Sequence, residues 1–130
     1  MQGMRYALAV MAMLCCWPTA GRAGAIEDAL RKLAPEERAN QACAIKGMDT
    51  LRRDRRLPGA DRVKSSIADP AHFDGKVITA KGGAVREKGK WYALQYTCTV
   101  TSDQMKATSF TYVVGKEIPE AKWEQYGLWK

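Results

Sequence analysis

Apolar and polar side chains alternate along residues 90–100, which is the pattern of a β-strand with one buried face. Successive side chains of a strand point to opposite faces. The apolar face comprises Tyr92, Leu94, Tyr96, Cys98 and Val100. The opposite face is mostly polar and comprises Trp91, Ala93, Gln95, Thr97 and Thr99. We expect the rest of the fold to be arranged around this strand.

Other segments are also expected to be extended. The β-branched run Val77-Ile78-Thr79 predicts a strand over residues 76–80, which follows a turn at Asp74-Gly75. Gly82-Gly83 predicts a bulge or loop, and a turn at residues 87–89 leads into the central strand. Residues 106–114 form the last predicted strand. For Arg62–Ile67 both a strand and a loop remain open, because only two of its residues are apolar.

The register of the last strand follows from which side chains must share the buried face. Phe110, Tyr112 and Val114 alternate in the same way as the apolar positions of the central strand. A shift of one residue would move all of them to the solvent side. A three-residue loop at residues 103–105 places Cys98 opposite Phe110 and Tyr96 opposite Tyr112. We therefore expect that register.

Helical spacing of apolar residues is found before and after these strands. It predicts a short helix over residues 26–33 and a longer one from Pro35 to about Asp54, with acidic residues in the first turn. One side of the longer helix collects Asn40, Cys43, Ala44, Gly47, Met48 and Leu51. A short C-terminal helix is expected from Pro119 to Gly127.

The N-terminus has the pattern of a secretory signal peptide. A short basic start is followed by an apolar run over residues 6–17, and Ala23-Gly24-Ala25 matches a cleavage pattern. We expect residues 1–25 to be removed, with cleavage after Ala25 or after Ala23, and residues 26–130 to form one mature domain. This places the protein in the periplasm or outside the cell. The alternative is an uncleaved membrane anchor.

Cys43 and Cys98 are the cysteines that remain after this cleavage, and an exported protein is expected to pair them. Two free thiols or half of a metal site are the alternatives. A metal site lacks partners because His72 is the only histidine, so no metal and no cofactor is expected. The predicted fold is α+β: an N-terminal helix held by a disulfide to an antiparallel meander of three to five strands, with a short C-terminal helix.

The charge distribution suggests one candidate binding site. The chain carries a net charge of +7, which falls to +5 on loss of the two arginines in the predicted signal peptide. Four arginines, Arg52, Arg53, Arg55 and Arg56, lie near the end of the longer helix, where guanidinium groups can bind phosphate or carboxylate. The alternative is that they complement the helix dipole and stay solvated. Nucleic acid is not an expected partner of an exported protein.

Two further groups of residues are candidates for a recognition surface and for a catalytic site. Trp91 is predicted to be a surface aromatic that contributes to a recognition face, although packing against the C-terminal helix explains it as well. His72, with Asp69 and Asp74 on either side, is the best arrangement for a small hydrolase-type enzyme. A solvated turn is the alternative for these three residues, and we expect no enzymatic activity.

A series of short motifs occurs in order along most of the chain. Upstream are Cys43, Met48-Asp49 and Asp61-Arg62-Val63, and downstream are Gly89–Tyr92, Tyr96–Thr101, Thr108–Phe110, Ile118–Glu120, Trp123 and Gly127–Trp129. With this series, residues 41–129 resemble the bacterial family called domain of unknown function 930. The resemblance implies a small exported protein of a Gram-negative bacterium. It does not indicate any particular activity, because none is assigned to the family. Lys64-Ser65-Ser66 departs from the valine-rich strand of the family pattern.

These observations favour a non-enzymatic binding module. An exported, disulfide-bonded domain with a basic helix end is expected to bind an envelope protein or an anionic lipid or glycan of the envelope. After signal cleavage the protein is not expected to be an integral membrane protein. The sequence does not determine its oligomeric state.

Overall fold

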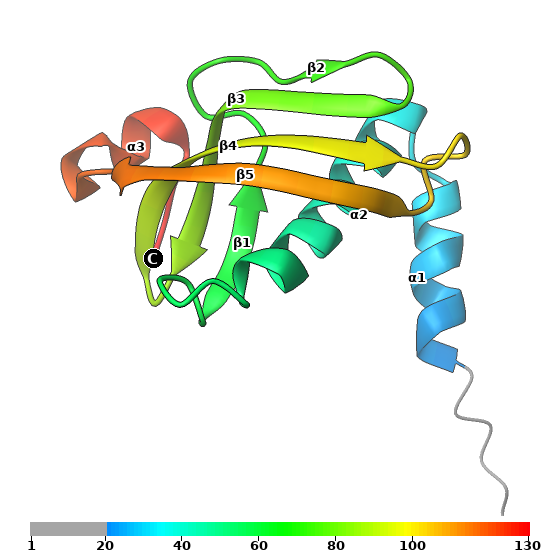
Figure 1. Ribbon diagram of the computed structural model, residues 1–130, viewed down its shortest axis with the longest axis horizontal. Coiled ribbons are helices and arrows are strands. Elements are labelled where there is room, and N and C mark those ends of the chain that lie inside the picture. Colours follow the sequence, from blue (N-terminus) through cyan, green and yellow to red (C-terminus); the bar gives the residue numbers. More distant parts are fainter. Residues whose placement is uncertain (1–20) are drawn as a thin grey trace, which may run out of the picture.

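The computed structural model describes residues 21–130 and shows an α+β fold, as predicted (Figure 1). The helices are α1 (Gly21–Arg31), α2 (Pro35–Leu51), the 3₁₀ turn η1 (Glu120–Lys122) and α3 (Trp123–Tyr126). The strands are β1 (Ala60–Lys64), β2 (His72–Phe73), β3 (Val77–Glu87), β4 (Lys90–Val100) and β5 (Ala107–Glu117). The predicted signal peptide lies largely outside the described residues, and both predicted cleavage points fall within α1.

The five strands form one antiparallel sheet in the order β1-β3-β4-β5. The two-residue strand β2 pairs with β3 near the start of β3, whereas β1 pairs with its end. The predicted interruption at Gly82-Gly83 is a bulge within the single long strand β3. The uncertain segment at residues 62–67 is a strand only as far as Lys64, and this strand begins earlier than expected, at Ala60.

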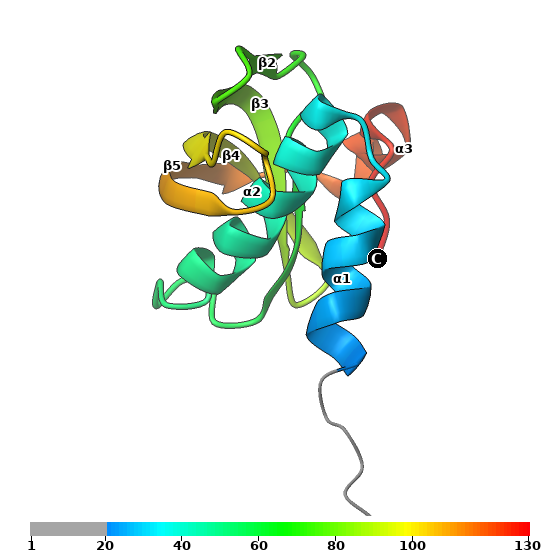
Figure 2. The ribbon, with the colours of Figure 1, turned by 90° about the vertical axis from the view of Figure 1, so that its right-hand side faces the viewer.

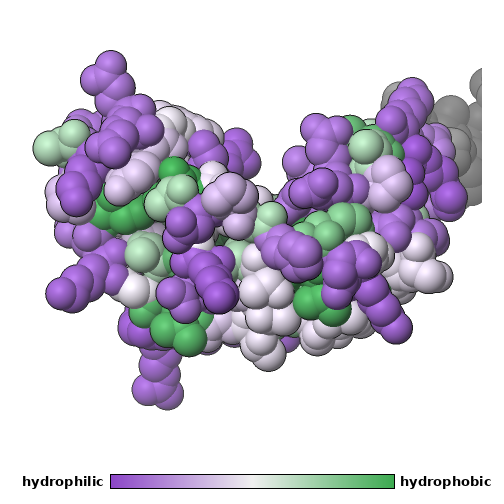
Figure 3. Space-filling view, turned by 90° about the horizontal axis from the view of Figure 1, so that it is seen from above, coloured by the Kyte–Doolittle hydropathy of each residue, from purple (hydrophilic) through white to green (hydrophobic). Residues whose placement is uncertain are grey.

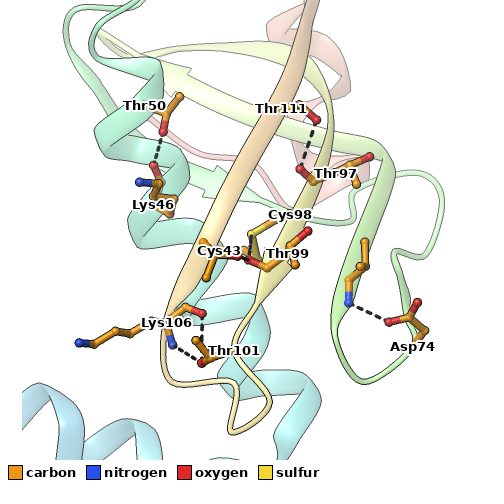
Figure 4. Close-up of a disulfide and its surroundings, with 12 residues drawn as sticks. Cys43, Lys46, Thr50, Asp74, Thr97, Cys98, Thr99, Thr101, Lys106 and Thr111 are labelled. Atoms are coloured by element: carbon orange, nitrogen blue, oxygen red, sulfur yellow. Dashed lines mark hydrogen bonds between the residues drawn. A yellow bond between two sulfur atoms is a disulfide. The ribbon is translucent and has the colours of Figure 1, made fainter.

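Helix α2 crosses one face of the sheet and buries the main core against it (Figure 2). It begins at Pro35 as predicted but ends at Leu51, three residues before the expected end. Its buried face meets the predicted apolar face of β4 and the alternate residues of β3 and β5. Cys43 and Cys98 are both fully buried and form the expected disulfide, which joins α2 to β4 with a Cα–Cα distance of 6.0 Å (Figure 4).

The predicted pairing of β4 with β5 is confirmed, but the connection between the strands differs from the expected one. Cys98 pairs with Phe110 and Tyr96 with Tyr112. The backbone N–H of Thr101 donates to the Lys106 carbonyl at 2.9 Å, so four residues rather than three form the loop. A bulge between residues 107 and 109 supplies the extra residue. It thereby restores the register that buries Phe110.

Trp91 is completely buried, so its prediction as a surface aromatic is wrong. It lies on the sheet face opposite α2 and belongs to a second apolar cluster with Ala84, Ile118, Trp123 and Leu128. Its indole N–H donates to the Trp129 carbonyl at 2.7 Å, and its own carbonyl accepts from the Ile118 N–H. The C-terminal segment therefore covers this end of the sheet, which explains why a tryptophan occupies the otherwise polar face.

The connection between α1 and α2 is held by the side chain of Arg38. Its guanidinium group donates to the backbone carbonyls of Leu30, Arg31 and Leu33, near the C-terminus of α1. It also reaches the carbonyl of Asp103 in the β4–β5 loop, at 2.8 Å. One side chain thus joins the α1–α2 corner to a distant turn of the sheet.

Removal of the disulfide should destabilise the fold without changing it. The bridge spans 55 residues, and the chain-entropy model gives about 4 kcal/mol for a loop of that size. We expect Cys43→Ala/Cys98→Ala to lower the free energy of unfolding by up to about that amount in urea denaturation. Reductant should lower the free energy of unfolding of the wild type by the same amount, and it should not change that of the double variant. Equal stability of oxidised and reduced wild type would contradict this prediction.

Gly47→Ala should destabilise the protein although alanine favours helices. A Cβ atom at Gly47 would lie 2.8 Å from the Phe110 ring, and that ring stacks on Tyr96 with centroids 4.7 Å apart. Overpacking of this kind costs about 1–3 kcal/mol, which exceeds the gain of about 1 kcal/mol in helix propensity. Thermal unfolding should show a lower Tm. The added substitution Phe110→Leu should recover part of the loss, and a rise in Tm for Gly47→Ala alone would contradict the packing argument.

Candidate functional site

The four arginines predicted as a site lie in the loop that follows α2, at residues 52–56. The loop is fixed at both ends by Leu51 and Leu57, which are fully or almost fully buried. All four arginines are exposed and lie within this one short loop. Hereafter we call residues 52–56 the basic loop.

Asp54 organises the basic loop from its centre. Its carboxylate accepts hydrogen bonds from the backbone N–H, Nε and Nη2 of Arg56, at 2.9, 3.0 and 2.7 Å. The Tyr112 hydroxyl of β5 donates to the same carboxylate at 2.9 Å. The loop is therefore attached to the sheet through an acid that the sequence analysis did not include in the site.

These contacts shift the titration of the groups around Asp54. The side-chain hydrogen bonds from Arg56 are the largest cause of an Asp54 pKa held well below its usual value. The same pairing raises the pKa of Arg56. Burial, and then the hydrogen bond to Asp54, raise the pKa of Tyr112. Asp54 is thus anionic and Arg56 cationic at neutral pH.

Two more arginines of the loop also have partners. Arg52 Nε donates to the Ala60 carbonyl at 2.7 Å, which joins the loop to the start of β1. Arg53 pairs with Asp49 one helical turn earlier, at 3.1 Å, but both side chains are largely exposed. A solvent-exposed pair of this kind contributes little stability. The cationic groups most accessible to an anionic partner are therefore those of Arg53 and Arg55.

The three residues of the enzyme hypothesis lie in and around β2. Asp69, His72 and Asp74 are all exposed. The Asp74 carboxylate accepts from the backbone N–H groups of Val77 and Lys76, at 2.7 and 2.9 Å, and these bonds lower its pKa. Asp74 therefore serves as a turn cap here. Catalysis at these residues stays an untested hypothesis.

Trp91 takes part in an aromatic and cationic cluster at the C-terminal end of the chain. The Trp91 and Trp129 rings meet edge to face with centroids 5.6 Å apart, and the Arg86 guanidinium lies within 6 Å of both rings. Asp61 holds Arg86 by two hydrogen bonds of 2.7 and 2.8 Å. Lys64 lies over the Trp129 ring and donates to the Gly127 carbonyl. These contacts hold the C-terminal segment in place.

A groove between α2 and β1 was not predicted from the sequence. It has a volume of about 400 Å³. One wall is formed by Asn40, Gln41, Ala44 and Met48 of α2, the other by residues 62–66, and Tyr96 also contributes to the lining. Seen from above, the molecule is hollowed between the end that carries α3 and the end that carries α1 (Figure 3). Asn40, Ala44 and Met48 belong to the helix side that the sequence pattern predicts to pack against the sheet, so this pattern indicated packing rather than a groove.

The groove has polar groups with few protein partners. The Oδ1 atom of Asn40 is buried and accepts no hydrogen bond within residues 21–130. Burial raises the pKa of Tyr96 to about 12, and the nearby Ser65 hydroxyl opposes this shift. Tyr96 is therefore a protonated hydroxyl at neutral pH. None of the lining residues is acidic.

Comparisons with known proteins identify a family and nothing further. Within residues 21–130, no helix is long and apolar enough to cross a membrane, and no group of three or more His, Cys, Asp or Glu side chains there is arranged to hold a metal. Neither the curated proteins nor the solved structures contain a match. The family model described as Domain of Unknown Function (DUF930) matches residues 30–128, which is most of the chain. The chain therefore belongs to this family, as the ordered series of motifs in its sequence indicates.

Proposed function

We propose that this protein is an exported, non-enzymatic module that binds an anionic component or a protein of the cell envelope through its basic loop. The observation that carries the proposal is the geometry of that loop. Asp54 and Arg52 fix its backbone to β5 and β1, while Arg53 and Arg55 extend into solvent. Binding therefore requires little ordering of the loop, which lowers the entropic cost of association.

Export is part of the proposal and has two supports. The N-terminal pattern of residues 1–25 is that of a signal peptide. The disulfide between Cys43 and Cys98 is of the kind found in oxidising compartments. The location in turn makes phosphate and carboxylate groups of lipids and glycans the anions that the loop would meet.

Intact mass of the protein recovered from the periplasm tests the export. We expect a mass equal to residues 26–130, or 24–130 for the alternative cleavage, less two hydrogens for the disulfide. Alkylation should add mass only after reduction. A species that retains residues 1–20, or one that is alkylated without reductant, would contradict export through a cleaved signal.

The binding role is tested by Arg53→Gln/Arg55→Gln, which leaves the anchoring contacts of Arg52 and Arg56 in place. Co-sedimentation with vesicles of phosphatidylglycerol and phosphatidylcholine, and separately with purified lipopolysaccharide, provides the measurement. Losing two phosphate contacts should weaken binding by about tenfold or more at low salt, with a smaller difference at high salt. Vesicles of phosphatidylcholine alone should not bind.

The matched control is Lys116→Gln/Lys122→Gln, which removes the same charge from two exposed lysines outside the basic loop. It should bind within about twofold of the wild type, because it leaves the contacts of the basic loop in place, whereas attraction that depends only on net charge would weaken both double variants equally. Equal losses in both double variants would show non-specific attraction. That result, or an absence of wild-type binding to both anionic surfaces, would overturn the basic-loop proposal.

A further inference from the structure

The free edge of β1 forms one wall of the groove between α2 and β1. β1 pairs with β3 on one side, and no other described strand pairs with it. Five consecutive residues, 62–66, line the groove, and the first three of them belong to β1, which ends at Lys64. Because successive side chains of a strand point to opposite faces, a consecutive run borders a cavity through its edge. The groove is therefore lined on this side by backbone as well as side-chain groups.

An edge strand beside a helix is an arrangement that can accept an added strand. The unpaired N–H and C=O groups of an edge pair with an extended chain, and neighbouring pockets take its alternate side chains. Arg52 already shows that the start of β1 accepts such a bond, because its Nε donates to the Ala60 carbonyl at 2.7 Å. The groove is lined by residues further along the chain, from Arg62 to Ser66.

The dimensions of the groove fit a short extended segment. From Asn40 to Met48 the helix rises about 12 Å, at about 1.5 Å per residue. An extended chain advances about 3.3 Å per residue, so about three to four residues fit along this wall. The volume of about 400 Å³ is in the range of sites that hold small ligands.

The chemistry of the lining indicates which segment would bind. Gln41 lines the groove and is exposed, so its amide can donate to and accept from a peptide backbone. Ala44, Met48 and Val63 add apolar surface for a side chain. No acidic residue lines the groove, so a basic segment would find no counter-charge there and is disfavoured.

We infer that the groove between α2 and the free edge of β1 binds an extended, neutral or acidic peptide segment of a partner protein, which adds to the sheet beside β1. This site is separate from the basic loop, and it does not depend on the binding role proposed for that loop. Recognition combines backbone pairing along β1 with side-chain contacts from α2.

The test begins with a cysteine-free random heptapeptide display library and the oxidised mature protein. The library is selected on the wild type and counter-selected on Ala44→Trp, in which an indole fills the groove from α2. The best peptide is then measured by fluorescence polarisation against both proteins. We expect Ala44→Trp to weaken binding by about tenfold or more. Neutral and acidic sequences should be enriched over basic ones.

The control is Ile45→Trp, which introduces the same side chain one position along α2, at an exposed residue that does not line the groove. It should bind within about twofold of the wild type. Amide hydrogen exchange of the wild type should slow within residues 62–66 when the peptide is bound, because added-strand pairing protects edge amides. A purely side-chain contact would leave those amides unchanged.

Three results would overturn the inference. The first is the absence of peptides that distinguish the wild type from Ala44→Trp. The second is binding that Arg53→Gln/Arg55→Gln abolishes while Ala44→Trp does not, which would place the peptide on the basic loop. The third is a concentration-dependent dimer, seen by analytical ultracentrifugation, that Ala44→Trp dissociates, because the groove would then hold a second copy of this chain.

Discussion

The contact between α2 and the sheet determines where almost everything else in this protein lies. Gly47 allows the Phe110 ring to pack directly against the helix backbone, and that ring in turn stacks on Tyr96. One helical turn away, the disulfide fixes Cys43 of α2 to β4. A packed contact and a covalent bond at adjacent positions leave little freedom for the helix to slide or rotate. Both candidate surfaces, the basic loop and the groove, are positioned by this helix.

The loop that follows α2 shows how a charged segment can be both exposed and ordered. Leu51 and Leu57 anchor the two ends of this loop in the core. Between them, Asp54 accepts a hydrogen bond from Tyr112 and Arg52 donates one to the Ala60 carbonyl. Exposed ion pairs alone would not achieve this, because their individual contributions are small. The order comes from contacts of partly buried groups to other elements. Two guanidinium groups are consequently displayed on a rigid base.

Much of the fold follows from patterns that the sequence shows directly. Alternation in β4 and β5, together with the need to bury Phe110, predicts their pairing, and Cys43 and Cys98 fall where a disulfide can join helix and sheet. The four-residue loop with its compensating bulge could not be predicted, because a shorter loop satisfies the same pattern. Trp91 was misassigned because alternation alone cannot show that the C-terminal segment covers one end of the polar face. The basic loop was identifiable from composition, whereas the groove arises only when β1 lies beside α2.

The contacts around Trp91 give the last residues of the chain a structural role out of proportion to their number. The carbonyl of Trp129 accepts a hydrogen bond from the indole N–H of the fully buried Trp91, and two cationic side chains, Lys64 and Arg86, lie within 6 Å of the Trp129 ring. Loss of Trp129 would deprive that N–H of its acceptor. It would also free Arg86 and Lys64 from the aromatic surface. The integrity of residues 127–129 therefore determines whether this end of the sheet stays covered.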